Sequence, residues 1–276
     1  MITVIIPAYN EEHFIGETLS YLLASEPTGG PVQVIVVANG CIDKTVQAAL
    51  ALDNRFAEKS WQLEVLDLPE GSKTRALNAG DTAARYDKRV YIDADVHVSP
   101  PLIAGLARAL DRPDPAYAGG RPRIRPAASF VSQRYARFWE RLPFMATGVP
   151  GCGVYAVNAA GRARWGVFPD IISDDTFVRY HFSTNEMHAV DATYSWPITE
   201  GFGALVRVRR RQDLGLAELH ATFPDLAASR DRTAPDASTK LARFMSDPIG
   251  FVIYAAVALT VRSPLFGNRT RWERGR

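Results

Sequence analysis

Ile2-Thr3-Val4-Ile5-Ile6-Pro7-Ala8-Tyr9-Asn10-Glu11-Glu12 begins the chain with a β-branched apolar run that gives way to a polar, acid-rich turn. The run predicts a buried strand, and a proline after it is typical of the point where a strand leaves its ladder. Residues 11–25 then place apolar side chains at helical spacing, with Asn10 available to cap the helix. A strand followed at once by a helix is the first part of a strand–helix–strand unit.

The same alternation runs through the first hundred residues. Further strands are predicted at residues 32–38, 63–68 and 89–93, and further helices at residues 43–52 and 73–86. Strands that alternate with helices form a mostly parallel sheet with helices on both faces. The sequence therefore predicts an α/β fold with a Rossmann-like central sheet.

After residue 100 the pattern becomes mixed. Helices are predicted at residues 102–110, 129–141 and 174–182, and strands at residues 116–124, 154–157 and 187–196. Beyond residue 201 the pattern is mostly helical, interrupted by a polar loop at residues 229–238. We expect the later strands to extend one continuous sheet and the end of the chain to form a helical extension.

Composition limits the classes of function. The 276 residues are 47% hydrophobic with a formal net charge of +2, so the chain can bury a large core and its charge does not demand nucleic acid as a partner. Two cysteines, Cys41 and Cys152, exclude a disulfide framework and a cysteine-based zinc site and suit a reducing compartment. The chain starts directly with a strand and shows no basic leader, so we expect a cytoplasmic protein.

The apolar run at residues 248–261 leaves two interpretations open. It is shorter than the roughly 20 residues that span a bilayer, so it is either a buried helix or a helix at a membrane interface. Residues 262–276 contain five arginines and one glutamate. Such a tail is attracted to anionic lipid, which would place the protein at the inner face of the membrane; a solvated terminus is the alternative.

Asp93-Ala94-Asp95 ends the strand predicted at residues 89–93. In an extended backbone, residues two apart point to the same side, so both carboxylates can face one crevice. Open α/β sheets bind their ligands at the carboxyl ends of the strands. Paired carboxylates there suit Mg²⁺ or Mn²⁺, which would neutralise the phosphate charge of a substrate.

Other strand ends carry similar polar turns. Tyr9 offers a ring on which a base can stack, and Glu11 offers a carboxylate that can accept from a ribose hydroxyl. Asn39 makes a tight turn after the second strand, and Asp43 stands at the start of the next helix. Lys73 lies in the first turn of a helix, where a cation opposes the helix dipole, and a phosphate-bearing ligand nearby would remove that conflict.

In chain order, four of these segments resemble the family 2 inverting glycosyltransferases, which have the GT-A fold: Pro7-Ala8-Tyr9-Asn10-Glu11-Glu12, Asn39-Gly40-Cys41-Ile42-Asp43-Lys44-Thr45, Ser72-Lys73-Thr74-Arg75-Ala76-Leu77-Asn78-Ala79-Gly80 and Asp93-Ala94-Asp95. The resemblance spans roughly residues 2–215. It implies a nucleotide-sugar donor in contact with Pro7, Ala8, Tyr9, Glu11, Asn39, Asp43, Lys73, Asp93 and Ala94. It also implies a divalent cation, Mg²⁺ or Mn²⁺, which Asp95 binds and which bridges the diphosphate.

Two later segments extend the resemblance. Ile172-Ser173-Asp174-Asp175-Thr176-Phe177-Val178-Arg179 resembles the family's Thr-Glu-Asp-type segment, whose last acid is the catalytic base. By this resemblance Asp175 is the base, and Asp174 replaces the usual glutamate. Gly151, Cys152 and Gly153 resemble the family's glycine-rich turn on the acceptor side. The implied division is a donor-binding half at residues 1–98, an acceptor-binding and catalytic half at residues 99–224, and a helical extension at residues 225–276.

One signature of the family is absent. The Gln-x-x-Arg-Trp motif, frequent in processive members, has no clean counterpart, since residues 207–212 keep an arginine at Arg210 without the matching glutamine and tryptophan. We therefore expect no extrusion of a polymer. Arg207 and Arg210 are expected either to contact donor phosphates or an anionic acceptor, or to solvate a helix face. His220 and, as a second candidate, His181 are possible additional metal ligands.

The acceptor is expected to be a hydroxyl compound, namely a glycan, a lipid-linked molecule or a small molecule. Two rival functions stay open. A nucleotidyltransferase uses a similar sheet and similar acids, and release of pyrophosphate from a sugar 1-phosphate and a nucleoside triphosphate would support it. A catalytically degenerate nucleotide-sugar-binding protein would show neither transfer nor donor hydrolysis.

Overall fold

Eight strands form one sheet in the computed structural model, which describes residues 1–146, 149–228 and 245–263. The strand order is β3-β2-β1-β4-β7-β6-β8-β5. The strands are β1 (Ile2–Ala8), β2 (Val32–Asn39), β3 (Gln62–Leu68), β4 (Arg89–Ile92), β5 (His97–Val98), β6 (Tyr117–Ile124), β7 (Val154–Val157) and β8 (Met187–Trp196). The first four strands of that order are parallel, and β7 adds to β4 in antiparallel register. The predicted α/β fold class is therefore confirmed.

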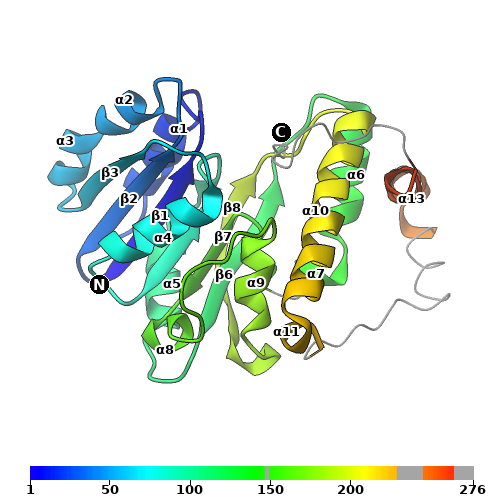
Figure 1. Ribbon diagram of the computed structural model, residues 1–276. Coiled ribbons are helices and arrows are strands. Elements are labelled where there is room, and N and C mark those ends of the chain that lie inside the picture. Colours follow the sequence, from blue (N-terminus) through cyan, green and yellow to red (C-terminus); the bar gives the residue numbers. More distant parts are fainter. Residues whose placement is uncertain (147–148, 229–244, 264–276) are drawn as a thin grey trace. The chain divides into compact units, whose positions relative to one another are not determined.

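Helices cover both faces of the parallel part of the sheet (Figure 1). On one face, Ile2, Val4 and Ile6 pack with side chains of α1 (Ile15–Leu23), α2 (Thr45–Leu50), α3 (Asp53–Glu58) and α5 (Leu102–Ala109). Successive strand residues point to opposite sides of the sheet, so Ile35 and Val37 face the other side. There they pack against α4 (Lys73–Ala83). Gly80 lets α4 approach β1 closely, since a Cβ there would lie 2.4 Å from a methyl carbon of Ile5.

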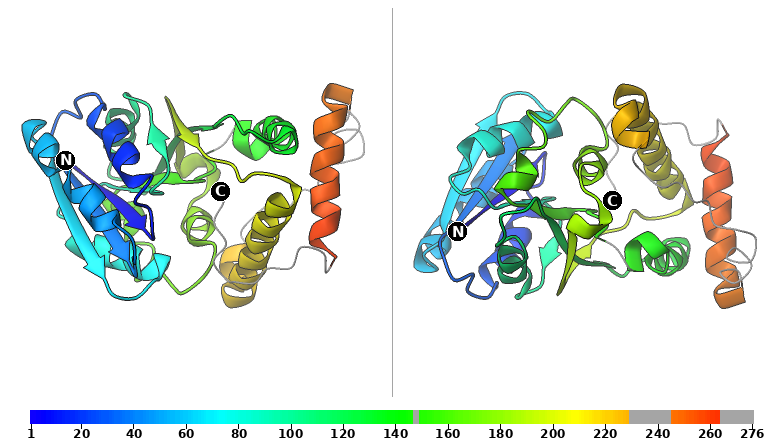
Figure 2. Two further views of the ribbon diagram at one scale, coloured as in Figure 1. Left: turned by 90° about the horizontal axis from the view of Figure 1, so that it is seen from above. Right: turned by 90° about the horizontal axis from the view of Figure 1, so that it is seen from below.

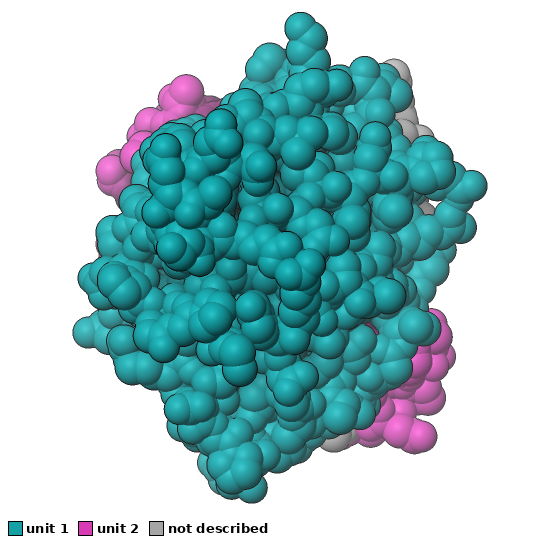
Figure 3. Space-filling view, turned by 90° about the vertical axis from the view of Figure 1, so that its left-hand side faces the viewer, with its two compact units in different colours: residues 1–123, 148–170, 181–196 teal, residues 124–147, 171–180, 197–276 magenta. Residues whose placement is uncertain are grey.

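The chain divides into two compact units, coloured separately in Figure 3. The first unit, residues 1–123, 148–170 and 181–196, holds the sheet, the helices named above, α8 (Ala159–Arg162) and a 3₁₀ turn at Thr184–Glu186. The second unit is helical and comprises residues 124–147, 171–180 and 197–276. Its helices in the described residues are α6 (Phe130–Glu140), α7 (Pro143–Ala146), α9 (Asp174–Tyr180), α10 (Phe202–Thr222), α11 (Pro224–Ala228) and α13 (Pro248–Val261). The functional division at residues 98 and 224 stays a prediction.

Among the described residues, helix α13 packs against α6 and α10 (orange to red in Figure 2). The rings of Phe251 and Tyr254 lie 5.9 and 5.1 Å, centroid to centroid, from the ring of Phe138 on α6. On the outer side, Ile249, Val252 and Leu259 are 47%, 57% and 67% exposed. Interpretation of this run as a fully buried helix is therefore wrong, because it is apolar all round and only one face is covered.

Most predicted elements are confirmed, several with the same bounds: β7, β8 and α13 begin and end where the sequence placed them. Helix α1 begins at Ile15 and not at residue 11. Asn10 has a φ of 53° and turns the chain, and its Oδ1 accepts a hydrogen bond from the backbone N–H of Ile42, 2.8 Å away. Asn10 therefore joins two loops and is not the cap of α1.

Several short elements were not foreseen, namely α3, α7, α8, the 3₁₀ turn and β5, because segments of two to six residues are too short to show a period. Strand β1 also continues through Pro7 to Ala8 in register with β2, although we expected it to stop at the proline. Its pairing with β4 ends at Ile5, so the missing N–H of Pro7 removes no bond of the ladder on that side.

The polar loop predicted at residues 229–238 and the arginines beyond Arg262 lie outside the described residues. Within the described part of the chain, no helix combines the length and the apolarity that a membrane span requires.

Candidate active site

The loops that follow β1, β2 and β3 are held together by the amide of Asn39. This side chain is 3% exposed, and its Nδ2 donates to the carbonyl oxygen of Ala8 over 2.8 Å. Its Oδ1 accepts from the backbone N–H of Ser72 over 3.0 Å. Because one buried amide joins three strand ends, Asn39 fixes the carboxyl edge of the parallel sheet.

Asp43 joins the first two loops. Its Oδ2 accepts from the backbone N–H of Glu12 over 3.1 Å, and its Oδ1 accepts from that of Thr45 over 3.0 Å. Partial burial raises the pKa of the Asp43 carboxyl, but the bonds from Thr45 and Glu12 outweigh it and leave the pKa below its ordinary value. The structure thus keeps Asp43 ionised and occupied with the backbone of these loops.

Tyr9 lies at the same edge and is 46% exposed. Its ring borders Gly71, where an added Cβ would lie 3.3 Å from the ring carbon Cε2. The turn after β2 also lies in close contact with the turn after β3. Gly40 has a φ of +65°, and a Cβ there would lie 2.5 Å from the backbone nitrogen of Gly71. Larger residues at these two glycines would push the aromatic ring and the loops apart.

Lys73, whose charge opposes the dipole of α4, forms an ion pair with an aspartate. Its Nζ lies 3.0 Å from Oδ1 of Asp93, and both side chains are about one-third exposed, at 32% and 34%. The backbone N–H of Asp93 donates to the carbonyl oxygen of Gly153 over 2.9 Å. The first residue of α4, the residue after β4 and a residue of the turn before β7 therefore meet at this edge.

A side chain of α1 holds the turn formed by Asp93, Ala94 and Asp95 through a hydrogen bond. Thr18 is fully buried, and its hydroxyl donates to the carbonyl oxygen of Ala94 over 2.7 Å. Asp95 itself is half-buried. The sequence predicts no such role for Thr18, because nothing in its local pattern distinguishes it from an ordinary helix residue.

Gly151, Cys152 and Gly153 form the turn before β7. Both glycines have left-handed backbones, with φ of +76° and +72°. A Cβ on Gly151 would lie 2.1 Å from the hydroxyl oxygen of Tyr117, so a side chain has no room there. The carbonyl oxygen of Cys152 accepts from the hydroxyl of Tyr194 over 2.6 Å, which fixes the turn beside Asp93.

The carboxylates of Asp93 and Asp95 fit a divalent cation that takes some of its ligands from a substrate. Mg²⁺ is usually held by one or two carboxylates and completes its shell with water and phosphate oxygens. The edge supplies two carboxylates of this kind, Asp93 and Asp95. In the part of the chain that the structure describes, no three His, Cys, Asp or Glu side chains are grouped to hold a metal by themselves.

The predicted base lies in the second unit, in the first turn of α9. Asp174 is 3% exposed, whereas Asp175 is half-buried. Oδ1 of Asp175 accepts from the backbone N–H of Thr176 over 2.6 Å. Acidic side chains are favoured at a helix N-terminus, and the bond from Thr176 orients Asp175 there.

Three other predicted residues lie on α10. The guanidinium of Arg210 donates to the carbonyl oxygens of Thr260, Val261 and Ser263 over 3.2, 3.2 and 2.6 Å. These bonds satisfy the free carbonyls at the end of α13, so the structure gives Arg210 a capping task that a donor phosphate would have to displace.

His220 and Arg207 belong to the same helix. The ring of His220 stacks on that of Tyr180, and its Nε2 lies 3.4 Å from the tyrosine hydroxyl oxygen. Arg207 is half-buried on the same helix. His181 belongs to the first unit, where its ring lies 5.6 Å from that of Trp165 and its carbonyl accepts from Arg164. The metal-binding and phosphate-binding roles of these residues stay predictions.

Comparison with solved structures agrees with this architecture. The S. aureus protein TarS (residues 1–349) gives a TM-score of 0.59 at 15% identity, with 96% of this chain and 75% of that chain covered. The mannosyltransferase PcManGT of Pyrobaculum calidifontis, crystallised with GDP-Man and Mn²⁺, gives 0.55 at 22% identity over 95% of this chain and 76% of that one. Glucosyl-3-phosphoglycerate synthase of Mycobacterium tuberculosis gives 0.57 at 18% identity over 84% and 81%.

The sheet and its likeness to these structures define an α/β protein with the GT-A fold. The sequence model of glycosyl transferase family 2 matches residues 3–164, which is more than half of the chain. The chain belongs to this glycosyltransferase family.

Two curated relatives match part of the chain. The uncharacterized glycosyltransferase EpsJ of Bacillus subtilis (strain 168) is 27% identical over 112 residues, which are 41% of this chain and 31% of that protein. Dolichyl-phosphate beta-glucosyltransferase of Drosophila melanogaster is 36% identical over 101 residues, which are 34% and 30%. The chain thus matches about three-tenths of the length of these relatives.

Proposed function

We propose that this chain transfers a sugar from a nucleoside diphosphate-sugar to an acceptor hydroxyl in a metal-dependent, inverting reaction. The observation that carries the proposal is the meeting of Lys73, Asp93 and the Gly153 turn at the carboxyl edge of the parallel strands, next to Asp95. Open α/β sheets bind nucleotides at this edge. Solved relatives of the same fold were crystallised with UDP-GlcNAc and with GDP-Man and Mn²⁺, which supports a donor of this class.

In the proposed reaction, Asp175 accepts the proton of the acceptor hydroxyl. The acceptor oxygen forms a bond to the anomeric carbon as the bond from that carbon to the diphosphate oxygen breaks, and the nucleoside diphosphate leaves. A single displacement inverts the configuration at that carbon. A divalent cation bound through Asp95 and Asp93 would supply positive charge for the departing diphosphate.

The remaining groups of the edge hold the donor in this scheme. The exposed ring of Tyr9 provides a stacking surface for a base. Lys73, already placed against Asp93, provides a second positive charge for phosphate oxygens. Asn39 and Asp43 act through the backbone, because their polar atoms bind the loops that carry Tyr9 and Glu11.

The donor site is tested by replacing Asp95. We expect Asp95→Asn to weaken the Mn²⁺-dependent binding of UDP or GDP at least about tenfold, because loss of a ligand charge would lower the affinity of this edge for a divalent cation. The measurement is a thermal-shift titration of each nucleoside diphosphate with and without Mn²⁺.

Asp87→Asn is the matched control, since Asp87 is exposed and lies before β4 at its other end. Equal affinities of the Asp95 variant and the unmodified protein in the Mn²⁺ titration would remove Asp95 from the cation site. A screen in which neither nucleotide stabilises the unmodified protein would contradict the proposed donor class.

We also propose that α13 docks on an anionic membrane, where a lipid-linked acceptor would be available. Its outer face is apolar through Ile249, Val252 and Leu259. An exposed arginine lies at each end of α13. At the start, Nη1 of Arg141 lies 3.9 Å from Oδ2 of Asp247, the residue that caps the helix, and Arg262 follows the last residue of the helix. An apolar helix face with cationic ends is the arrangement of interfacial helices.

Vesicle binding tests this surface. We expect the double variant Val252→Glu, Leu259→Glu to bind phosphatidylglycerol vesicles at least about tenfold more weakly than the unmodified protein, because two charges replace exposed apolar side chains that would enter the lipid. Leu50→Glu is the control, since Leu50 is 52% exposed on α2, in the other unit. Unchanged vesicle binding of the double variant would contradict docking of α13 on a membrane. So would the finding that the unmodified protein is a dimer and the double variant a monomer, because the apolar face would then be covered by a second copy of the chain.

A further inference from the structure

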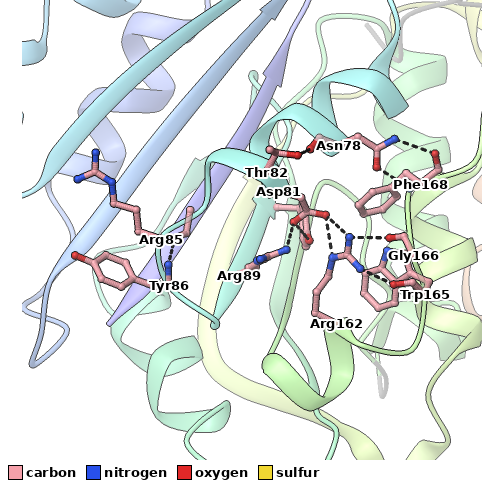
Figure 4. Close-up of polar contacts among 12 residues, drawn as sticks. Asn78, Asp81, Thr82, Arg85, Tyr86, Arg89, Arg162, Trp165, Gly166 and Phe168 are labelled. Carbon is pink, nitrogen blue, oxygen red and sulfur yellow. Dashed lines mark hydrogen bonds and ion pairs between the residues drawn. The ribbon is translucent and has the colours of Figure 1, made fainter.

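Helix α4 carries two polar side chains that the donor site does not use. Asn78 makes a two-bond contact with the backbone of Phe168: its Nδ2 donates to the carbonyl oxygen over 3.0 Å, and its Oδ1 accepts from the N–H over 2.7 Å. Three residues later, Asp81 is 8% exposed and points toward β4 and α8 (Figure 4). One helix face therefore holds a segment that lies ninety residues away in the sequence.

Asp81 acts on the same segment through an arginine. Its Oδ2 lies 2.9 Å from Nε and 2.8 Å from Nη2 of Arg162. The other donors of that guanidinium bind the carbonyl oxygens of Trp165 and Gly166 over 2.7 and 2.8 Å. The plane of Arg162 also lies over the ring of Trp165, 4.6 Å from its centroid. The carboxylate thus fixes the arginine that orders the chain after α8.

Together, Asn78 and Arg162 bind four backbone groups in residues 165–168, which we call the anchored loop. From Phe168 to Asp175 the chain runs only seven residues. Within the second unit, the next fixed point is the backbone N–H of Ile172, which donates to Oε2 of Glu218 over 2.9 Å. The segment before Asp175 is therefore tied at both of its ends.

We infer that Asn78 and Asp81 are positioning residues for the transfer reaction: they fix the anchored loop from which the chain continues to the proposed base. This inference rests on the role proposed for Asp175. Helix α4 has Lys73 in its first turn and Asn78 and Asp81 in later turns, so one rigid element carries both a donor contact and the anchor of the loop. A displacement of a reacting group by about 1 Å can lower the rate by up to about a hundredfold, so loss of such an anchor is expected to slow the reaction.

The first test measures hydrogen exchange. In Asn78→Ala the N–H of Phe168 loses its acceptor, so we expect its exchange to become about tenfold faster, with no change in β1 and β2. Asn78→Asp keeps an acceptor oxygen for that N–H and loses only the donor. The exchange rate of the Phe168 N–H in this variant should therefore lie between the rates in the unmodified protein and in Asn78→Ala. Thr82→Ala is the control on the same helix, because the Thr82 hydroxyl donates to the backbone carbonyl oxygen of Asn78, 2.9 Å away, and not to the loop.

The second test separates positioning from general stability. Hydrolysis of UDP-GlcNAc and GDP-mannose is measured, and we expect Asn78→Ala to lower kcat about tenfold or more with little change in KM, and Asn78→Asp to recover part of it. The binding of UDP or GDP with Mn²⁺ should be unchanged in both variants.

Unchanged exchange at Phe168 in Asn78→Ala would overturn the inference, and so would faster exchange with an unchanged kcat. Should Asn78→Ala fail to fold, Asn78→Asp carries the same comparison with Thr82→Ala. Exchange requires no turnover, so a protein that hydrolyses neither sugar nucleotide contradicts the proposed function, and exchange at Phe168 still decides whether Asn78 anchors the loop.

Discussion

Asp175→Asn is expected to lower the turnover of sugar transfer by about 10²–10⁴-fold, the usual contribution of a positioned general base. Asparagine keeps the size and the acceptor oxygen that binds the N–H of Thr176, so the start of α9 should be preserved. The amide cannot take the proton of the acceptor hydroxyl. Donor affinity should therefore stay almost unchanged while kcat falls.

The measurement is steady-state kinetics with the preferred donor, together with a direct titration of the matching nucleoside diphosphate. Asp225→Asn is the control, because Asp225 is an exposed aspartate in the first turn of another helix of the same unit, α11. Parallel losses of nucleotide affinity and rate would place Asp175 in the donor site and reject it as the base. A full rate in the variant would also reject it.

Asp81→Asn is expected to lower the free energy of unfolding by about 3–5 kcal/mol. The carboxylate is 7% exposed and lies 2.7 Å from Nη1 of Arg89 and 2.8 Å from Nη2 of Arg162, whose side chains are 18% and 16% exposed. It also accepts from the hydroxyl of Tyr91 over 2.7 Å. Removing its charge leaves two largely buried guanidinium groups without their counter-charge.

Urea unfolding measures this effect as a lower midpoint with an unchanged m-value. Asp111→Asn is the matched control: Oδ1 of Asp111 lies 2.8 Å from Nζ of Lys88, but its side chain is 81% exposed. Water and salt screen that pair, so its loss should change the midpoint little. Equal shifts in the two variants would show that the burial of Asp81 does not determine its contribution.

The sequence placed a set of polar residues at one edge of the sheet, because strand ends are read from local patterns. An apolar run followed by a polar turn places Tyr9, Asn39, Lys73 and Asp93 at the carboxyl ends of parallel strands, and these ends meet in any such sheet. The pairing of Lys73 with Asp93 follows from that placement.

Individual tasks were harder to assign. Asp43 was predicted to contact the donor, which stays a prediction, and the structure shows that its oxygens bind the backbone of Glu12 and Thr45. Arg210 was predicted either to contact donor phosphates or an anionic acceptor, or to solvate a helix face. The structure adds that it caps the end of α13, and the binding roles stay predictions. A carboxylate or a guanidinium in a motif shows which charge is present, whereas its partners depend on which chain segments pack against it.

The alternation of strand and helix, the parallel sheet and the polar residues at its edge were determined by the sequence alone, because periods of two and 3.6 residues depend only on near neighbours along the chain. Only the tertiary structure decided that Asn78 binds Phe168 and that Asp81 binds Arg162, pairs separated by 90 and 81 positions. It also decided that α13 covers one of its apolar faces and exposes the other. Such contacts depend on how distant segments pack, which no local pattern of residues specifies.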